Sequence, residues 1–442
     1  MAENKSNFKE LSISNPKTGR DASMVGGIIE LKYYESILSN HITASLIVGD
    51  TGNAIKDGDI DKNDLLNGLP VRGGEPVRLR VLDSNGTELR FIDDYAFYVN
   101  RVKSGVQDTT RSIIVFDLCT KEFIANEQTR VQKRYSGKIS ESVDKILKNV
   151  LQTGNYDKSD IEPTANSYNF IGNSWKPFFV LTWLAGKSIP SDGPYGKTAG
   201  FFFYETANGF QFKSAESLIS KTKGGGSADT KSIKKFQSTD TPGVKDGFKK
   251  IIEYALNKNI DVQEKLTSGA YNTRFLFFNP YSFDVKHQDF SLKDQIKANV
   301  SSAGNELDFV AEEFRKGPTR GVSFVLDVGI LPSGKDAKKQ LDAWKNNKDN
   351  TNDKVTDRMV QSLSRYNQLF SISVDVMIEG DFSLHAGDII YCEFPDLAAS
   401  TKNVSKETSG LYLIASLCHK ITPTKTFTSM NLIRDSFGKK RA

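Results

Sequence analysis

The feature of this sequence that most constrains its fold is a series of alternating strands that occurs twice, once toward each end of the chain. The early series is HITASLIVGD (41–50), GGEPVRLRVLD (73–83), YAFYVNRVKSG (95–105) and RSIIVFDLCT (111–120). The late series is LFSISVDVMIEGD (369–381), AGDIIYCEFPD (386–396), GLYLIASLCHKI (410–421) and TFTSMNLIRDS (426–436). In each series a Gly-acid turn opens the second strand, at Gly74-Glu75 and at Gly387-Asp388. Any two meanders alternate in this way. The shared order of elements therefore carries the interpretation that one small antiparallel β-domain is present twice.

The sequence between the two series predicts further parts. Residues 140–152 and 175–185 carry apolar side chains at helical spacing, and 199–214 reads as an aromatic hairpin. We predict an α+β, β-rich chain with two β-barrel-like domains, a small α+β domain and an exposed insertion. The predicted divisions are a first β-domain at 20–129, an α+β domain at 130–219, a flexible linker at 220–243, a discontinuous second β-domain at 244–290 and 365–437, and an insertion at 291–364. The turns at Asn85-Gly86 and Asn208-Gly209 suggest type I′ hairpins.

Charge and apolar content exclude several classes of protein. The chain has 59 Lys and Arg against 54 Asp and Glu, a net charge of +5, and the basic residues are dispersed. A dedicated nucleic-acid binder would concentrate them on one face. No run of 18 apolar residues occurs, so no membrane-spanning helix is expected, and the polar start MAENKSNFKE lacks a signal-peptide core. Three scattered cysteines indicate a reducing site of synthesis.

The stretch GDFSLHAGDIIYCEFPD (380–396) gathers acidic residues, His385 and Cys392. Closed zinc sites need four ligands at chelating spacing, whereas His385 and Cys392 lie seven positions apart. The Gly-Asp pairs are ordinary turn residues. We therefore interpret this stretch as a turn and a strand, with Cys392 on an apolar strand face.

Two other stretches approach known ligand motifs. SDGPYGKT (191–198) nearly matches a phosphate-binding loop, but serine replaces the first glycine and a helix precedes it. DGDIDKNDLLNGLP (57–70) begins like a calcium loop and lacks the glycine and glutamate that such loops need. A weak cation site near Asp59–Asn63 stays open. We predict no catalytic, cofactor-binding or metal-binding residues, and no cofactor.

Four longer pieces, in this order, resemble the central baseplate hub of T-even-like contractile-tailed bacteriophages. They are MVGGIIELKYYESILSNHITASLIVGD with GGEPVRLRV, RVQKRYSGKISESVDKILKNVL, FIGNSWKPFFVLTWLAGKSIP with AGFFFYETANGFQFKS, and LSRYNQLFSISVDVMIEGDFSLHAGDIIYCEFP with GLYLIASLCHKITPTKTFTSMNLIRDS. Late-control tail proteins and the hub region of type VI secretion spike proteins are similar. Residues 220–243 and 333–352 lie outside the likeness.

The resemblance implies a non-enzymatic structural protein. It would form a ring-shaped homotrimer whose six β-domains join a hexameric tail tube to a trimeric cell-puncturing spike. Expected partners are the chain itself, the spike protein, the tail tube protein, other baseplate proteins, a tape-measure protein, and DNA that passes through the channel without being read. The expected location is the virion tail baseplate, after assembly in the host cytoplasm. Two alternatives stay open: the hub of a type VI or extracellular contractile injection system, and a tail-associated cell-wall hydrolase that uses carboxylates at 57–64 or 381–396.

Overall fold

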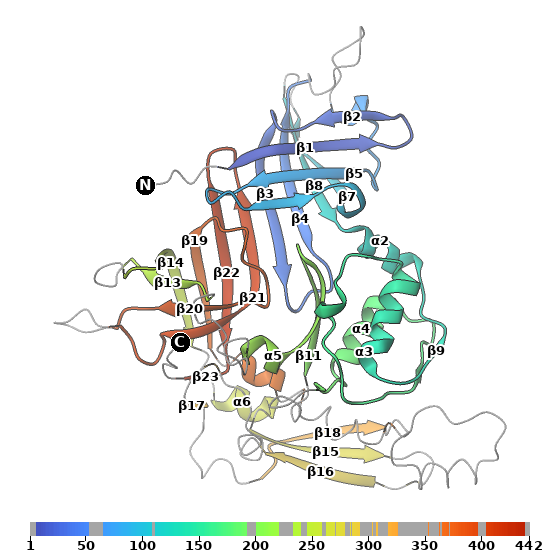
Figure 1. Ribbon diagram of the computed structural model, residues 1–442, viewed down its shortest axis with the longest axis vertical. Coiled ribbons are helices and arrows are strands. Elements are labelled where there is room, and N and C mark those ends of the chain that lie inside the picture. The colour runs from blue at the N-terminus through green and yellow to red at the C-terminus, as the bar shows by residue number, and fades with distance from the viewer. Residues whose placement is uncertain are drawn as a thin grey trace.

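The computed structural model shows an α+β, β-rich fold with two barrels joined by one continuous sheet (Figure 1). The residues it describes are 6–52, 65–107, 111–191, 200–220, 233–239, 245–258, 262–269, 271–278, 283, 285–291, 303, 306–307, 317–325, 352, 362, 365–370, 372–396 and 404–437. Fourteen strands belong to the large sheet, and smaller sheets lie beside and below it.

The first barrel is built from the N-terminal strands. They are β1 (Asn7–Asn15), β2 (Arg20–Ser23), β3 (Ile28–Ser36), β4 (Thr43–Asp50), β5 (Pro76–Leu82), β6 (Glu88–Phe91), β7 (Phe97–Gln107) and β8 (Ser112–Cys119), with the short helix α1 (Leu65–Gly68) before β5. The order of pairing is β2-β1-β5-β7-β8-β4-β3. Among the described residues no pairing joins β2 to β3, so this barrel is open on that side. The predicted domain began at residue 20, so the prediction missed β1, which pairs with β5 from Asn7 onward.

The second barrel is a closed ring of six strands. They are β13 (Lys235–Ser238), β14 (Phe248–Lys258), β19 (Ile372–Glu379), β20 (Ile389–Glu393), β21 (Gly410–Ile421) and β22 (Thr426–Arg434). Each pairs with the next in the order β13-β14-β19-β22-β21-β20, and β20 pairs back to β13. Pairing of β13 is parallel on both sides, so this barrel is not wholly antiparallel. Alternate side chains of both barrels point into a shared buried core, as the period of two predicts.

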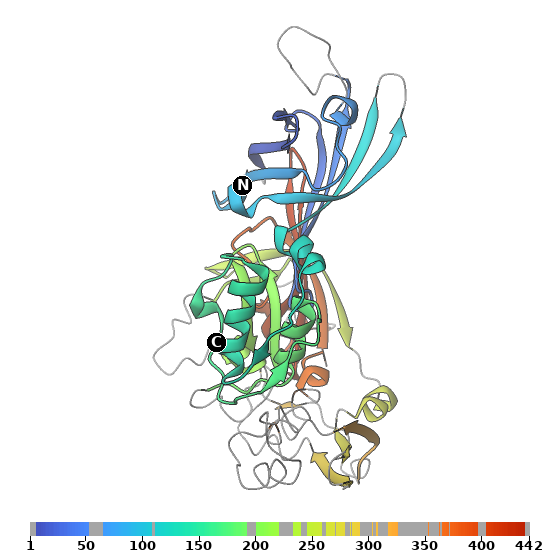
Figure 2. The same ribbon diagram turned by 90° about the vertical axis from the view of Figure 1, so that its right-hand side faces the viewer.

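A small α+β domain lies below the first barrel and alongside the second (Figures 1 and 2). It contains α2 (Lys121–Gln128), β9 (Arg134–Tyr135), α3 (Ile139–Ile146), a π-turn (Leu147–Leu151), β10 (Phe170–Ile171), α4 (Pro177–Ala185), β11 (Phe201–Thr206), β12 (Gly209–Ser214) and α5 (Ala215–Ser220). Pro177 opens α4, where a missing N–H costs nothing, and Gln152 ends the α3 turn with φ 53°. The domain has its own aromatic core.

A buried carboxyl attaches this domain to the first barrel. Glu205 on β11 accepts hydrogen bonds from the Ile42 amide at 3.0 Å, the Thr120 hydroxyl at 3.2 Å and the Asn155 side chain at 3.0 Å. Burial, together with nearby Glu122, raises the pKa of Glu205 well above its ordinary value. Glu205 therefore acts as a buried structural contact between the two parts.

The predicted linker and the predicted extent of the second domain are both wrong in part. Lys235–Ser238, placed in the linker at 220–243, forms the barrel strand β13. Residues 272–291, placed in the second barrel, form β15 (Asn272–Phe278) and β16 (Val285–Ser291) of a separate sheet with β18 (Arg320–Val325). That sheet lies below the barrels, with α6 (Val262–Ser268) above it (Figure 1). A last short pair joins β17 (Glu306–Leu307) to β23 (Ser436–Phe437).

Both predicted hairpins exist, but their turns are not type I′. Gly86 has φ 80° and its amide bonds the Asp83 carbonyl, while Asn85 is not among the residues with positive φ. In the second hairpin Thr206 pairs with Gly209, so the loop is Ala207-Asn208, and only Gly209 carries a positive φ, 104°. In each hairpin one glycine, Gly86 or Gly209, supplies the positive φ.

Candidate assembly interface

The two barrels repeat each other residue by residue. Strand β4 pairs with β8 in the same register as β19 pairs with β22, so Leu46 opposite Phe116 corresponds to Val376 opposite Met430. Strand β7 against β8 likewise matches β21 against β22. The register of β7 shifts between Val99 and Arg101, and that of β21 shifts between Ile414 and Ser416, so the two bulges coincide. Bulges are specific features, and their coincidence marks the strands as equivalent.

The repeat extends to a strand pair that the sequence comparison missed. Strand β3 against β4 shifts register between Ile28 and Glu30, and β14 against β19 shifts between Ile251 and Glu253. Both sites read Ile-Ile-Glu, and both bulged isoleucines, Ile29 and Ile252, are exposed. The Ile-Ile-Glu tripeptide is the feature of the sequence that indicates the equivalence of β3 and β14. It was overlooked because about 120 residues separate β14 from the strand that it joins.

The Gly-acid turns are equivalent as well. The Gly74 amide bonds the Val99 carbonyl at 2.7 Å, and the Gly387 amide bonds the Ile414 carbonyl at 2.9 Å. The two glycines have φ 86° and 87°. The predicted correspondence of Gly74-Glu75 with Gly387-Asp388 is thus seen in the hydrogen bonds themselves.

One strand pair joins the two barrels into a single sheet. The second half of β21, from Ser416 to Ile421, runs antiparallel to β3 from Ser36 to Leu31. Lys420 and Lys32 lie opposite each other, and Glu30 binds both ammonium groups, at 2.9 and 2.8 Å. The result is an unbroken surface of eight strands in the order β7-β8-β4-β3-β21-β22-β19-β14.

A buried carboxylate on β3 fastens this junction. The Glu35 carboxylate accepts four hydrogen bonds. They come from the His385 ring nitrogen at 3.1 Å, the Ala386 and Ala207 amides at 2.8 Å each and the Tyr33 hydroxyl at 2.6 Å. Burial acts to raise the pKa of Glu35, but His385 and these donors leave it lowered. Burial acts to lower the pKa of His385, but Glu35 leaves it raised. The cluster therefore holds an ion pair that links the two barrels and the tip of the β11–β12 hairpin.

A second carboxylate of the first barrel, Asp83, also binds the connection 380–388 that leads from β19 to β20. Buried Asp83, at the end of β5, accepts the Phe382 amide at 2.9 Å. Its other oxygen accepts the Asn85 and Thr87 amides, both at 2.8 Å. The connection 380–388 therefore rests on two acids of the first barrel, Glu35 and Asp83.

The eight-strand surface ends in two open edges. In the described part of the chain, β7 pairs only with β8 beyond Val99, and β14 pairs only with β19 beyond Ile251. Half-buried apolar side chains of the shared core lie on these edges, Val102 on β7 and Tyr254 and Leu256 on β14. Unpaired strand edges attract further strands, and these core side chains are incompletely covered.

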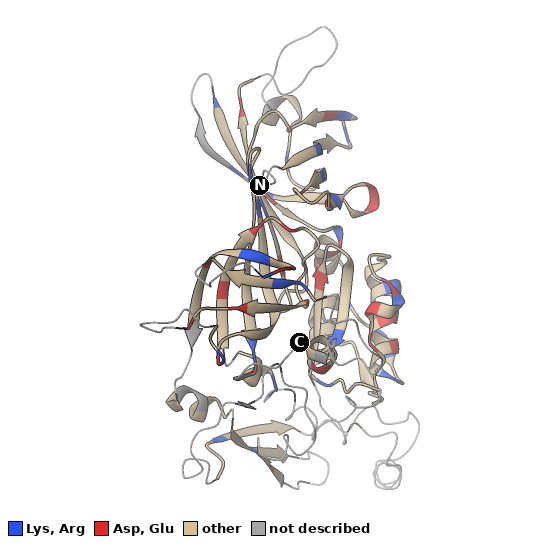
Figure 3. Ribbon diagram, turned by 60° about the vertical axis from the view of Figure 1, so that its left-hand side comes forward, with Lys and Arg blue, Asp and Glu red and all other residues tan. Residues whose placement is uncertain are grey.

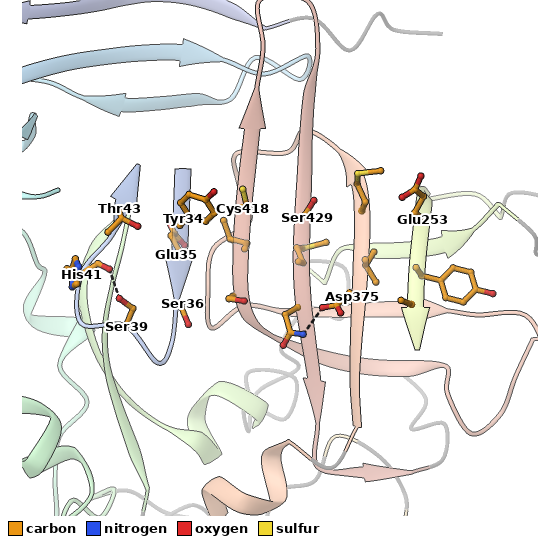
Figure 4. Close-up of a pocket in the computed structure, with 18 residues that line it drawn as sticks. Tyr34, Glu35, Ser36, Ser39, His41, Thr43, Glu253, Asp375, Cys418 and Ser429 are labelled. Carbon is orange, nitrogen blue, oxygen red and sulfur yellow. Dashed lines mark hydrogen bonds between the residues drawn. The ribbon is translucent and has the colours of Figure 1, made fainter. Parts of the chain in front are cut away.

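The face of the surface that points away from the barrel cores is hollowed (Figure 4). A groove of about 650 Å³ follows β4, β3, β21, β22, β19 and β14, and small and polar side chains line much of it. On β7, Arg101 and Lys103 share Asp117, at 2.8 and 3.0 Å. At the other end Glu253 and Asp375 are exposed. Elsewhere acidic and basic residues are interspersed over both barrels (Figure 3).

The stretch 380–396 forms the turn and the strand that the sequence predicted. Asp381 is bound by Lys234 at 3.0 Å and by Lys249 at 2.8 Å, and its pKa is low because these partners outweigh burial. Glu393 is bound by Lys245 at 2.7 Å. Cys392 lies in the barrel core, where burial raises its pKa. Within the described ranges, no three His, Cys, Asp or Glu side chains are grouped so as to hold a metal ion.

Other predicted features fall largely outside the described residues. These include the phosphate-loop-like stretch beyond Ser191, the calcium-like loop through Asp64 with the weak cation site near Asp59–Asn63, most of the linker, and the excursion 333–352 except Asn352. Among the helices that are described, none combines the length and the apolar character needed to span a bilayer.

No protein-family model matches the chain, and no curated protein matches its sequence. Similar solved structures include the 43 kDa tail protein of prophage MuSo2 from Shewanella oneidensis, with 10% identity, a TM-score of 0.48, and coverage of 97% of this chain and 98% of that one. A tail protein from Neisseria meningitidis MC58 has 9% identity, a TM-score of 0.48 and coverage of 96% of each chain. An E. coli type VI secretion component, described as similar to T4 tail proteins gp27 and gp5, has 10% identity, a TM-score of 0.40 and coverage of 99% and 79%. Tail and type VI proteins are the kinds that the sequence resemblance named.

Proposed function

We propose that this chain is a structural baseplate hub of a contractile phage tail. It assembles as a ring-shaped homotrimer that joins a hexameric tail tube to a trimeric spike and surrounds the DNA channel. The duplicated barrel with two open edges carries the proposal. Three chains with two equivalent barrels each present six similar domains around one axis, which reconciles threefold and sixfold neighbours.

The junction within the chain supplies a template for the junction between chains. Strand β21 corresponds to β7, and β3 corresponds to β14, so the pairing of β21 with β3 has an open counterpart in β7 and β14. In the same register, Lys103 of one copy lies opposite Asn257 of the next, as Cys418 lies opposite Tyr34. Pairing these edges removes both unpaired rows of N–H and C=O groups and closes the ring.

Side chains at the two edges favour the same arrangement. Val102 would lie diagonally across from the half-buried Leu256 of the neighbouring copy and continue the core across the junction. The Arg101–Lys103–Asp117 group carries a net positive charge, and the edge strand of the neighbouring copy carries exposed Glu253, with exposed Asp375 on the strand beside it. Complementary charge steers partners into register.

Cysteine pairing tests this register directly. We expect the variant Lys103→Cys/Asn257→Cys to form disulfides between chains under mild oxidation, giving dimers and trimers on a denaturing gel. Tyr34→Cys is the matched positive control, because it faces the native Cys418 at the equivalent intrachain position. Each single cysteine variant and the out-of-register pair Lys103→Cys/Glu253→Cys should give little cross-linking.

Light scattering on the unmodified protein tests the stoichiometry. A species of three times the 49.1 kDa chain mass is expected to grow with protein concentration. A monomer at every concentration, together with an uncross-linked cysteine pair, would rule out the ring.

In this ring the grooved face would line the channel, and its polar, interspersed charges suit passage of DNA without sequence reading. The proposed partners are the spike protein, the tail tube protein, other baseplate proteins and a tape-measure protein, and the proposed place is the virion baseplate after assembly in the host cytoplasm. Of the carboxylates of 381–396 that could have suggested a hydrolase, Asp381 and Glu393 make ion pairs and Asp388 closes a turn. We therefore propose no enzymatic activity, and a turbidity assay on peptidoglycan should show no clearing.

A further inference from the structure

Asp396 is the counterpart of Asp83, but its environment differs. The registers that equate β5 with β20 place Val77, Leu79 and Val81 in one barrel core and Ile390, Cys392 and Phe394 in the other. Continuing the alignment, the Asp that follows each strand is Asp83 in the first barrel and Asp396 in the second. Asp83 is buried under the connection 380–388, whereas Asp396 is exposed. Of the two equivalent acids, Asp83 is therefore covered within the chain and Asp396 is exposed to solvent.

The connection that would cover Asp396 is also identifiable. The Glu75 carboxylate accepts a hydrogen bond of 2.7 Å from the backbone amide of Arg72, three residues earlier. In the same way the Asp388 carboxylate accepts one of 3.0 Å from the backbone amide of His385, three residues earlier. Arg72 is therefore the counterpart of His385, the residue that reaches across the intrachain junction to Glu35. Arg72 is exposed, and within the described residues its guanidinium has no partner.

At the junction between copies the counterpart of Glu35 is not an acid. Glu35 corresponds to Lys258, since Glu30 and Glu253 mark the same register. The register position of Glu35 is therefore occupied by a residue type that cannot accept the Arg72 guanidinium. Asp396 is the exposed carboxylate that follows the equivalent of β5 in the neighbouring barrel.

We propose that Asp396 of one copy binds Arg72 of the next copy, forming an ion pair that fixes the two barrels at the junction between chains. The inference rests on the proposed ring and adds a specific contact away from the strand edges. An arginine–carboxylate pair is geometrically selective and becomes stronger as the interface excludes water. The pair would replace at this junction the buried Glu35–His385 pair that fastens the barrels within one chain.

A charge-reversal experiment tests the pair. Asp396→Arg and Arg72→Glu should each raise the dissociation constant for assembly about tenfold or more, as measured by sedimentation velocity, because like charges then face each other. The double variant Asp396→Arg/Arg72→Glu should recover most of the lost affinity. Circular dichroism and the thermal midpoint of each dilute single variant should match the parent, since both side chains are exposed in one chain.

The outcomes separate this inference from the ring itself. If the Lys103→Cys/Asn257→Cys pair cross-links while either charge reversal leaves assembly unchanged, the ring stands and the ion pair is wrong. If both reversals weaken assembly and the double variant does not recover, the two residues act separately and the inference is also wrong. If the cysteine pair fails to cross-link and no oligomer forms, the proposed function fails with it.

Discussion

At the scale of single residues, the chain places its ionisable groups where parts of the molecule meet. Glu35, Asp83 and Asp381 are buried, and each holds main-chain amides or ammonium groups from a distant segment. Breaking a buried pair costs more than the pair contributes, because the remaining charge is left dry. These acids therefore specify how the parts join.

The Glu35–His385 pair makes the stability of the junction depend on pH. The pKa of His385 is raised in the fold from 6.5, so its contribution is complete below about pH 6.5 and is lost as the pH rises through the folded value. We expect His385→Gln to lower the free energy of unfolding at pH 6 by about 1.5–3 kcal/mol, the range for hydrogen bonds to charged groups. The difference from the parent should shrink toward pH 9. Urea unfolding at both pH values measures it.

The comparison with His385→Gln is needed because another histidine acts in the opposite direction. Desolvation lowers the pKa of buried His419 to about 4. The protein therefore loses stability as the pH falls below 6.5, where the histidine of the unfolded chain takes up a proton. The charge of His385 contributes to that lowering, so the two proteins are compared only at pH 6 and above, where folded His419 is neutral. A gap between them that stays constant from pH 6 to 9 would show that the charge on His385 contributes nothing.

At the scale of elements, strand equivalence includes turns and bulges as well as alternation. Gly74 and Gly387 take the same left-handed conformation at the same point of each barrel. Their surroundings differ, because a Cβ on Gly387 would lie 2.2 Å from the Tyr204 hydroxyl, while one on Gly74 would meet nothing within 4 Å. The second turn is therefore packed against β11, and the first is open.

Matched alanine substitutions measure this difference. Gly74→Ala should lower the free energy of unfolding by about 1 kcal/mol, the cost of a left-handed alanine. Gly387→Ala carries the same backbone cost and must also displace Tyr204, so we expect about 2–4 kcal/mol in total. Chemical denaturation of both variants provides the measurement, and equal losses would contradict the packing difference.

At the scale of the whole molecule, the two junctions differ. The β21–β3 junction lies within one chain, whereas the proposed β7–β14 junction forms only when chains associate. The inner junction has the Glu30 and Glu35 ion pairs, whereas the outer edges bring together Lys103 and Arg101 with Glu253 and other partly exposed charges. Exposed charges are screened within about 8–10 Å at moderate salt. Assembly should therefore respond to ionic strength more than the fold of one chain does.

We expect an increase from 0.05 to 0.5 M NaCl to weaken assembly several-fold, as measured by mass photometry, while the unfolding midpoint of a dilute chain changes little. Glu253→Gln should reduce the salt dependence. Assembly that strengthens with salt would mean that apolar contacts of Val102, Tyr254 and Leu256 dominate the edges instead.

The sequence alone determined the two series of strands, their common order and the Gly-acid turns, because a half-covered strand alternates apolar and polar residues every two positions. It also predicted correctly that His385 and Cys392 belong to a turn and a strand. Only the tertiary structure decided that β3 and β14 complete the repeat, that Lys235–Ser238 closes the second barrel and that Glu35 meets His385. A strand's own residues record which face is buried, but its partner is chosen by backbone hydrogen bonds between segments far apart in the chain, and these leave no local pattern.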